Sequence, residues 1–111
     1  MNIQEQKQGA VTVLRPIGPL TQEDADQFKT KLLDVRQASM GRFVVDASSV
    51  PFVDSRGLEI LVEANEELSK SGQSLKVCGM NETLREVLNL TDLASMFEQF
   101  DDINAAVRSF L

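Results

Sequence analysis

One segment of the sequence concentrates the residue types that could do chemistry, and it runs from Val44 to Leu58 as VVDASSVPFVDSRGL. A short apolar run of branched residues ends at Asp46, a loop follows, and Asp54-Ser55 stands where apolar residues begin to recur at helical spacing. In α/β folds, ligands and partners gather at the carboxyl ends of such strands. A serine hydroxyl there meets the positive end of a helix dipole and free backbone N–H groups.

Two interpretations of Asp54-Ser55 follow from these residues. In the first, one of the two side chains caps the helix, as most Asp-Ser pairs at such a boundary do. In the second, the Ser55 hydroxyl accepts a phosphoryl group, because the N–H groups of the helix start would hold a phosphate. A phosphate adds about −1.5 to −2 charges beside Asp54. The folded domain would tolerate this charge, whereas a partner docked on the spot would not.

The composition argues against catalysis. The chain has no histidine, tryptophan or tyrosine, and its one cysteine is Cys78. A Ser-His-Asp relay, a Cys-His pair and an imidazole or thiolate metal cage are therefore excluded. The glycines lack the spacing of a P-loop or a dinucleotide-binding turn. We expect no enzyme activity, no metal and no cofactor, and we interpret Cys78 as a buried small side chain.

Length and charge limit the organisation and the partners. The 111 residues, 42% of them hydrophobic and 25% charged, fit one domain over residues 1–111. The net charge of −6 argues against nucleic acid and anionic membrane, which both need a basic face. No apolar run approaches the ~20 residues that span a bilayer, the N-terminus lacks a signal-peptide pattern, and a lone cysteine fits a reducing compartment. We expect a cytoplasmic monomer.

Strand and helix signals alternate along the chain and predict an α/β layer fold. The run Phe43-Val45 has the composition of a strand buried on both faces of a parallel sheet. The other strands are expected over residues 3–7, 10–14, 75–78 and 96–100, with Pro16 to Pro19 ending the second of these. Helix starts are expected at Thr21 as a threonine cap, at Ser55, at Asn81 and at Asp101-Asp102; the first helix ends at Gly41 and the second at Ser71-Gly72.

The whole chain, in order and length, resembles a STAS domain of the anti-sigma factor antagonist type. The motif that carries the resemblance runs from Asp46 to Leu58: an aspartate after a hydrophobic strand, a short loop with an apolar-aromatic step, then Asp-Ser-x-Gly-Leu. The segment Ile17-Gly18-Pro19-Leu20 is similar to the family's Gly-x-Leu step, and residues 79–91 are similar to its third-helix region. The resemblance implies a single STAS domain with a mixed central β-sheet flanked by about four α-helices.

By this resemblance, Ser55 is the phosphoacceptor of a partner-switching protein. The unphosphorylated domain is expected to bind a serine kinase that doubles as an anti-sigma factor, which frees the sigma factor. Phosphorylation would break that complex, and a PP2C-type phosphatase would restore it. Of the apolar loop residues, some must fill the core, while any left exposed near Ser55 would suit docking. The residues expected to contact the partner are Thr21, Val50, Phe52, Val53, Asp54, Arg56 and Gly57.

Two positions depart from the family's pattern. Family members usually carry a small residue where this chain has Arg56, and often an aspartate where it has Thr21. One negative charge is lost and one positive charge is gained near Ser55, which predicts a local field more favourable to a phosphate. Arg56→Ala should then slow phosphorylation or weaken kinase docking. The alternative is that Arg56 points to solvent in the first helical turn.

Other classes of function stay open at this point. Some STAS domains are permanent subunits of larger assemblies, for example against the ATPase of a lipid-transport ABC system, where the serine need not be phosphorylated. An enzyme or a nucleotide binder is the third class, and the missing histidine and phosphate loop argue against it.

Overall fold

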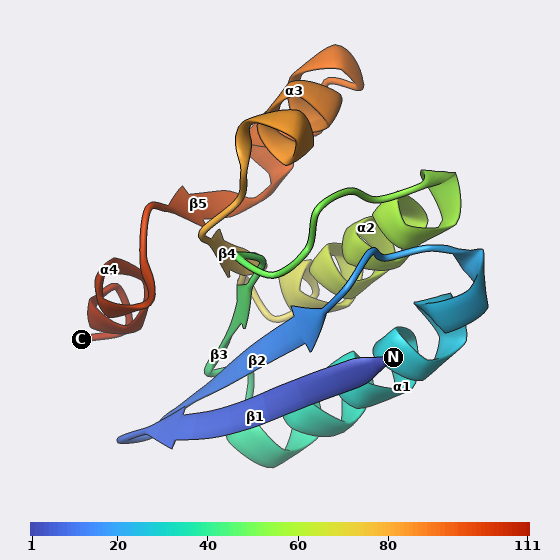
Figure 1. The fold of residues 1–111 in the computed structure, drawn as a ribbon. Helices are drawn as coiled ribbons and strands as arrows, with labels where there is room; N and C mark the ends of the chain where they lie inside the picture. The colour runs from blue at the N-terminus through green and yellow to red at the C-terminus, as the bar shows by residue number, and fades with distance from the viewer.

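The computed structural model describes residues 1–111, which form a five-stranded sheet with helices on both faces (Figure 1). The strands lie in the order β1-β2-β3-β4-β5; β1 pairs antiparallel with β2, and every other pairing is parallel. This mixed sheet with four helices confirms the predicted α/β fold. In chain order the elements are β1 (Asn2–Gln8), β2 (Val11–Ile17), α1 (Gln22–Ser39), β3 (Phe43–Asp46), α2 (Ser55–Ser69), β4 (Lys76–Cys78), α3 (Glu82–Leu90), the 3₁₀ turn η1 (Ala94–Met96), β5 (Glu98–Phe100) and α4 (Ile103–Arg108).

The two faces of the sheet carry cores of different size. In Figure 1, α1 and α2 lie side by side against one face, and the short α4 lies against the other. Successive side chains of β3 point to opposite faces of the sheet. Val45 belongs to the large core with Phe28 and Ile60, and Val44 belongs to the small core with Ala106. All four residues of β3 are buried, as the run Phe43-Val45 predicts.

Strand β2 continues through Pro16 to Ile17, so the expected break at Pro16 is wrong. In a strand the N atoms of alternate residues face the same side, and Gly18 N donates to the Ser49 carbonyl on the β3 side at 3.0 Å. The nitrogen of Pro16 therefore faces β3 as well. The parallel ladder between β2 and β3 ends at Leu14, so Pro16 removes no bond from it.

The last strand is shorter than expected. Residues 94–96 form a 3₁₀ turn, and β5 begins only at Glu98. Its one neighbour, β4, offers three residues for pairing, from Lys76 to Cys78. The length of β5 is therefore set by the strand beside it.

One polar side chain links the middle of α2 to the start of β4. Asn65 is buried in α2, and its Oδ1 accepts a hydrogen bond of 2.7 Å from the backbone N–H of Leu75. Nothing in the local pattern of α2 indicates this bond, because its two partners are ten residues apart in different elements.

Asn65→Ala should destabilise the fold, since it leaves the N–H of Leu75 buried without an acceptor. The expected loss in the free energy of unfolding is about 1–3 kcal/mol, measured by urea denaturation. Asn89→Ala, at an exposed position of α3, is the matched control and should change stability by less than about 0.5 kcal/mol. Equal effects of the two substitutions would contradict the assigned role of the Asn65 bond.

Candidate functional site

The loop between β3 and α2 is tied to the segment that precedes α1. Leu20 N donates to the Phe52 carbonyl at 3.1 Å, and Asp54 N donates to the Leu20 carbonyl at 3.0 Å. These bonds form an isolated parallel bridge between Leu20 and Val53. As a result, residue 21 at the start of α1 and residue 54 at the start of α2 lie next to each other.

The carboxylate of Asp54 caps both of these helices. Its Oδ1 accepts from Gly57 N at 2.8 Å, inside α2, and its Oδ2 accepts from Gln22 N at 2.8 Å, the first residue of α1. The hydrogen bond from Gly57, followed by those from other backbone N–H groups including Gln22, lowers the pKa of Asp54, because these donors favour the ionised carboxylate.

The expected threonine cap on α1 is therefore wrong. Thr21 occupies the cap position with extended backbone, but its side chain makes no capping hydrogen bond. The oxygen that reaches the N–H of Gln22 belongs to Asp54, from 32 residues further along the chain. Thr21 is half-buried beside the loop, and its contact with a partner stays a prediction.

Gly57 allows the start of α2 to approach the backbone of Leu20. A Cβ added at position 57 would overlap the Leu20 carbonyl oxygen and lie 2.9 Å from its carbonyl carbon. Gly57 is also buried, so its role in this structure is close backbone packing. This corrects its assignment as a surface contact for the partner.

Ser55 is the first residue of α2, and it is exposed. A protein kinase could therefore reach its hydroxyl. The expected capping role falls to Asp54 alone, which leaves the Ser55 side chain free for another use. Its phosphorylation stays a prediction.

The three apolar residues of the loop divide between core and surface. Val50 is 2% exposed and belongs to the main core, which corrects its assignment to a docking patch. Phe52 is 48% exposed, and Val53 is half-buried. Phe52 is therefore the large apolar side chain that the loop offers at the surface near Ser55.

Asn81 holds this loop from the other side, a role that the sequence does not indicate. As predicted, its Oδ1 caps α3 by accepting from Leu84 N at 2.8 Å. Its Nδ2 also donates to the carbonyls of Val50, at 3.4 Å, and Pro51, at 3.1 Å. The start of α3 and the loop that leads to Ser55 are thus joined by one side chain.

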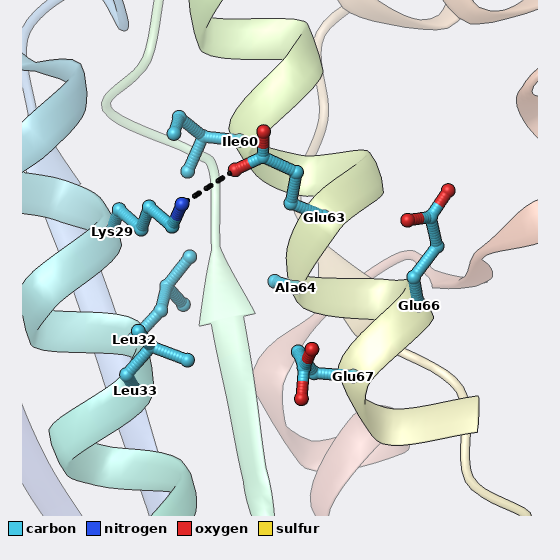
Figure 2. A pocket seen from close by; sticks show the side chains of 8 residues that line it. All are labelled: Lys29, Leu32, Leu33, Ile60, Glu63, Ala64, Glu66 and Glu67. Atoms are coloured by element: carbon cyan, nitrogen blue, oxygen red, sulfur yellow. Dashed lines mark ion pairs between the residues drawn. The ribbon is translucent and has the colours of Figure 1, made fainter. Parts of the chain in front are cut away.

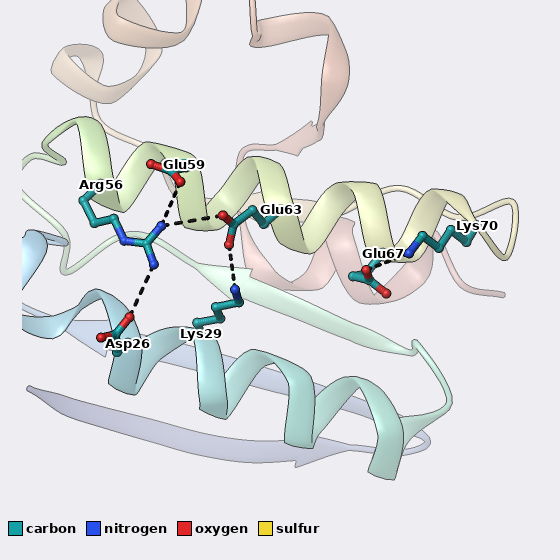
Figure 3. Close-up of polar contacts among 7 residues, drawn as sticks. All are labelled: Asp26, Lys29, Arg56, Glu59, Glu63, Glu67 and Lys70. Atoms are coloured by element: carbon teal, nitrogen blue, oxygen red, sulfur yellow. Dashed lines mark hydrogen bonds and ion pairs between the residues drawn. The ribbon is translucent and has the colours of Figure 1, made fainter.

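The side chain of Arg56 crosses from α2 to α1 (Figure 3). Its Nη1 lies 2.9 Å from a carboxylate oxygen of Glu59 and 3.6 Å from one of Glu63, and its Nη2 lies 3.3 Å from Asp26. The other oxygen of Glu63 pairs with Lys29 Nζ at 3.0 Å. This ion-pair network, formed by Asp26, Lys29, Arg56, Glu59 and Glu63, joins the two helices beside Ser55.

Neither expectation for Arg56 matches this arrangement. The side chain is 30% exposed, and three carboxylates of its own chain surround its charge, so it does not extend into solvent. These carboxylates also offset the positive charge that Arg56 was expected to contribute near Ser55. The prediction of a local field especially favourable to a phosphate loses its geometric basis.

The structure forms no group of three His, Cys, Asp or Glu side chains that could hold a metal ion. Cys78 is buried, and burial first, with the nearby charges of Asp46 and Asp102, raises the pKa of its thiol to about 12. The thiol therefore stays protonated and unreactive at neutral pH. None of the helices combines the length and the apolar character needed to cross a membrane.

Comparison with known proteins decides the family, because the sequence pattern of the STAS domain matches residues 2–106. The chain belongs to the STAS domain family. A relative from Thermotoga maritima, named as a candidate anti-sigma factor antagonist, is 29% identical over 98 residues, which cover 87% of each chain. A crystal structure under the same name from that organism has a TM-score of 0.88 at 26% identity and covers 96% of this chain and 92% of the other.

Two further structures show how widely this STAS fold is shared. The anti-sigma factor antagonist SpoIIAA in its unphosphorylated form has a TM-score of 0.76 at 18% identity, covering 98% of this chain and 96% of its own. A sulfate transporter family protein from Wolinella succinogenes has a TM-score of 0.75 at 25% identity, covering 90% of this chain and 84% of its own.

Gly57→Ala should lower the free energy of unfolding by about 1–3 kcal/mol, because the added Cβ overpacks the contact with Leu20. A loss of stability would identify overpacking, since alanine normally stabilises a helix by about 0.5–1 kcal/mol relative to glycine. Urea denaturation measures the change. Ser55→Ala, at the nearby exposed position, is the control and should stay within about 0.5 kcal/mol of the wild type. A stabilised Gly57→Ala variant would disprove the close approach.

Asp54→Asn should destabilise the protein at neutral pH and much less in acid. The folded-state pKa of Asp54 lies below its ordinary 3.8. Its ionised form therefore stabilises the fold above that ordinary value, and this contribution is lost as the pH falls through the lowered pKa. The Tm values of wild type and variant, followed by circular dichroism, should approach each other between about pH 5 and pH 2. Asp34→Asn, exposed on α1, controls for the loss of one charge; a Tm difference for Asp54→Asn that is independent of pH would refute the carboxylate cap.

Proposed function

We propose that this STAS protein is a phosphorylation-controlled antagonist of an anti-sigma factor. In the proposal, the unphosphorylated domain binds a serine kinase that acts as the anti-sigma factor, and phosphorylation of Ser55 breaks the complex. A PP2C-type phosphatase removes the phosphate and restores binding. The observation that supports this most directly is the exposed hydroxyl of Ser55 at the first residue of α2, beside the fixed carboxylate of Asp54.

Several of the groups that could hold a phosphate at this helix start already have other partners. Asp54 already occupies the N–H of Gly57 and the N–H of Gln22, and Arg56 is held by carboxylates. A phosphate on Ser55 would therefore remain at the surface, where it adds to the negative charge of Asp54. A partner docked there would have to desolvate both groups. A tenfold loss of affinity requires only ~1.4 kcal/mol.

Phe52 supplies the apolar part of the proposed docking surface. Aromatic side chains dominate the binding energy of many interfaces, and Phe52 is half-exposed in the loop that leads to Ser55. The bonds from Leu20 and Asn81 hold the backbone of this loop. The partner would thus meet a preformed surface, which reduces the entropy cost of association. Since such a kinase acts in the cytoplasm, we place the protein there, as a monomer.

The experiment compares Ser55→Ala and Ser55→Asp in binding to the serine kinase of the same host, measured by calorimetry. Ser55→Ala should bind like the unphosphorylated wild type and resist phosphorylation, and Ser55→Asp should bind at least about tenfold more weakly. Ser95→Ala and Ser95→Asp, at an exposed serine of η1, are the matched controls and should behave like the wild type. Equal affinities of the two Ser55 variants would refute the gating by phosphate.

A second candidate function is that of a constitutive subunit. The similarity to the sulfate transporter family protein of Wolinella succinogenes favours it, and an assembly with a lipid-transport ABC system is the same kind of role. In such a subunit, Ser55 would be an ordinary helix residue. The intact mass of the protein from its host separates the two functions, because only the first predicts a form heavier by ~80 Da, the mass of one added phosphate.

A further inference from the structure

Asn81 uses both ends of its amide, and only one of them serves the helix that it caps. Its Oδ1 accepts from Leu84 N at 2.8 Å, whereas its Nδ2 donates to the carbonyls of Pro51, at 3.1 Å, and Val50, at 3.4 Å. Aspartate and serine cap a helix about as well as asparagine does. A carboxylate, however, has no hydrogen to donate, and a serine hydroxyl ends one bond nearer to the backbone. The residue type at position 81 therefore meets a second requirement, which lies in the loop that leads to Ser55.

Two successive carbonyls of that loop are held from opposite sides. The Phe52 carbonyl accepts from Leu20 N at 3.1 Å, and the carbonyl of the preceding residue, Pro51, accepts from Asn81. Pro51 has no N–H with which to form a further bond. The side chain of Phe52 is 48% exposed, so it is not anchored in the core. Its position therefore depends on the two bonds that hold the backbone on either side.

Side-chain packing between the loop and α3 leaves a small hollow. The hollow measures about 20 Å³ and is lined only by apolar side chains, among them Val53 of the loop and Leu84 and Leu88 of α3. A space of this size without polar partners holds no ordered water, and its walls lose the dispersion contacts that a filled space would provide. Apolar packing therefore fixes the loop against α3 less firmly than a filled contact would, and the bonds from Asn81 supply the missing restraint.

The helices α1 and α2 are joined to each other by charged side chains, but α3 has no comparable tie. Lys29 of α1 pairs with Glu63 of α2 at 3.0 Å across the hollow between these two helices (Figure 2). Apart from Asn81, the polar side-chain contact of α3 with another element is the ion pair of Arg85 with Asp101, 3.6 Å long and exposed. Exposed pairs of this kind contribute little to stability. Asn81 is thus the main polar link between α3 and the rest of the domain.

We propose that Asn81 is a positioning residue for the docking surface that contains Phe52 and Ser55. Its amide holds the backbone at Pro51 in the conformation that a partner meets, although the partner need not touch Asn81. The inference rests on the proposed function for the identity of that partner, a serine kinase, whereas the restraint on the loop exists without it. Loss of the amide donor should therefore loosen the loop in the free protein and weaken kinase binding, even where the cap of α3 is kept.

The first test measures amide hydrogen exchange by NMR in the ¹⁵N-labelled full-length protein without a partner. Asn81→Ser and Asn81→Asp both keep a capping oxygen and remove the amide donor, and the serine adds no charge. The amides of Leu20 and Asp54, which bond the loop to the segment before α1, should exchange about two- to tenfold faster in both variants, the factor for one neutral hydrogen bond. The Leu84 amide should keep its protection. Asn89→Ser and Asn89→Asp, at an exposed position of α3, are the matched controls and should match the wild type.

The second test measures binding to the serine kinase of the same host by calorimetry. Both Asn81 variants should bind about two- to tenfold more weakly than the wild type, and both Asn89 variants should bind like it. In phosphorylation of Ser55, the KM should rise by the same factor while kcat stays within about twofold, because binding is weakened and the acceptor hydroxyl is unchanged.

Three results would overturn the proposal. The exchange of the Leu20 and Asp54 amides could be the same in the wild type and the Asn81 variants, or the variants could bind the kinase with the affinity of the wild type. A loss confined to Asn81→Asp would indicate a charge effect at the interface and would also overturn it. A wild-type protein that does not bind the kinase would instead count against the proposed function, and the exchange data would still decide whether Asn81 holds the loop.

Discussion

The carboxylate of Asp54 is the interaction on which the arrangement around Ser55 depends. It accepts hydrogen bonds from the first turn of α2 and the first residue of α1, both at 2.8 Å, so that one charged group fixes the starts of two parallel helices. The Leu20 carbonyl accepts from Asp54 N in the same place, and Gly57 lets the backbones approach. Asp54 and Gly57 are thus both required where the two helices start: the aspartate caps them, and the glycine lets the backbone of Leu20 approach α2.

This constraint bears on the proposed phosphorylation of Ser55. Because Asp54 already accepts from the N–H of Gly57 at the start of α2, a phosphate on Ser55 would compete with this carboxylate for the helix start and would add negative charge to the surface. Arg56 does not offset that charge, because its guanidinium is engaged with Asp26, Glu59 and Glu63. A change of this kind requires no refolding, only a partner that is sensitive to charge at the start of α2.

Local sequence patterns accounted for most of the fold. The alternation of strands and helices, the buried composition of Phe43-Val45 and the caps at Asn81 and Asp102 all appear in the structure. Each of these features depends on residues only a few positions apart, so a short stretch of sequence is enough to predict it. The course of β2 through Pro16 was missed because it depends on where the neighbouring strand β3 stops pairing.

The sequence by itself determined that Ser55 begins a helix after a buried strand, beside an acidic residue. Only the tertiary structure decided that Asp54 also caps α1, that Arg56 reaches Asp26, and that Val50 enters the core while Phe52 stays at the surface. The first two of these contacts join residues 30 or more positions apart. Periodicity and capping rules act within about one helical turn, so pairings across that distance become visible only when the helices are placed side by side.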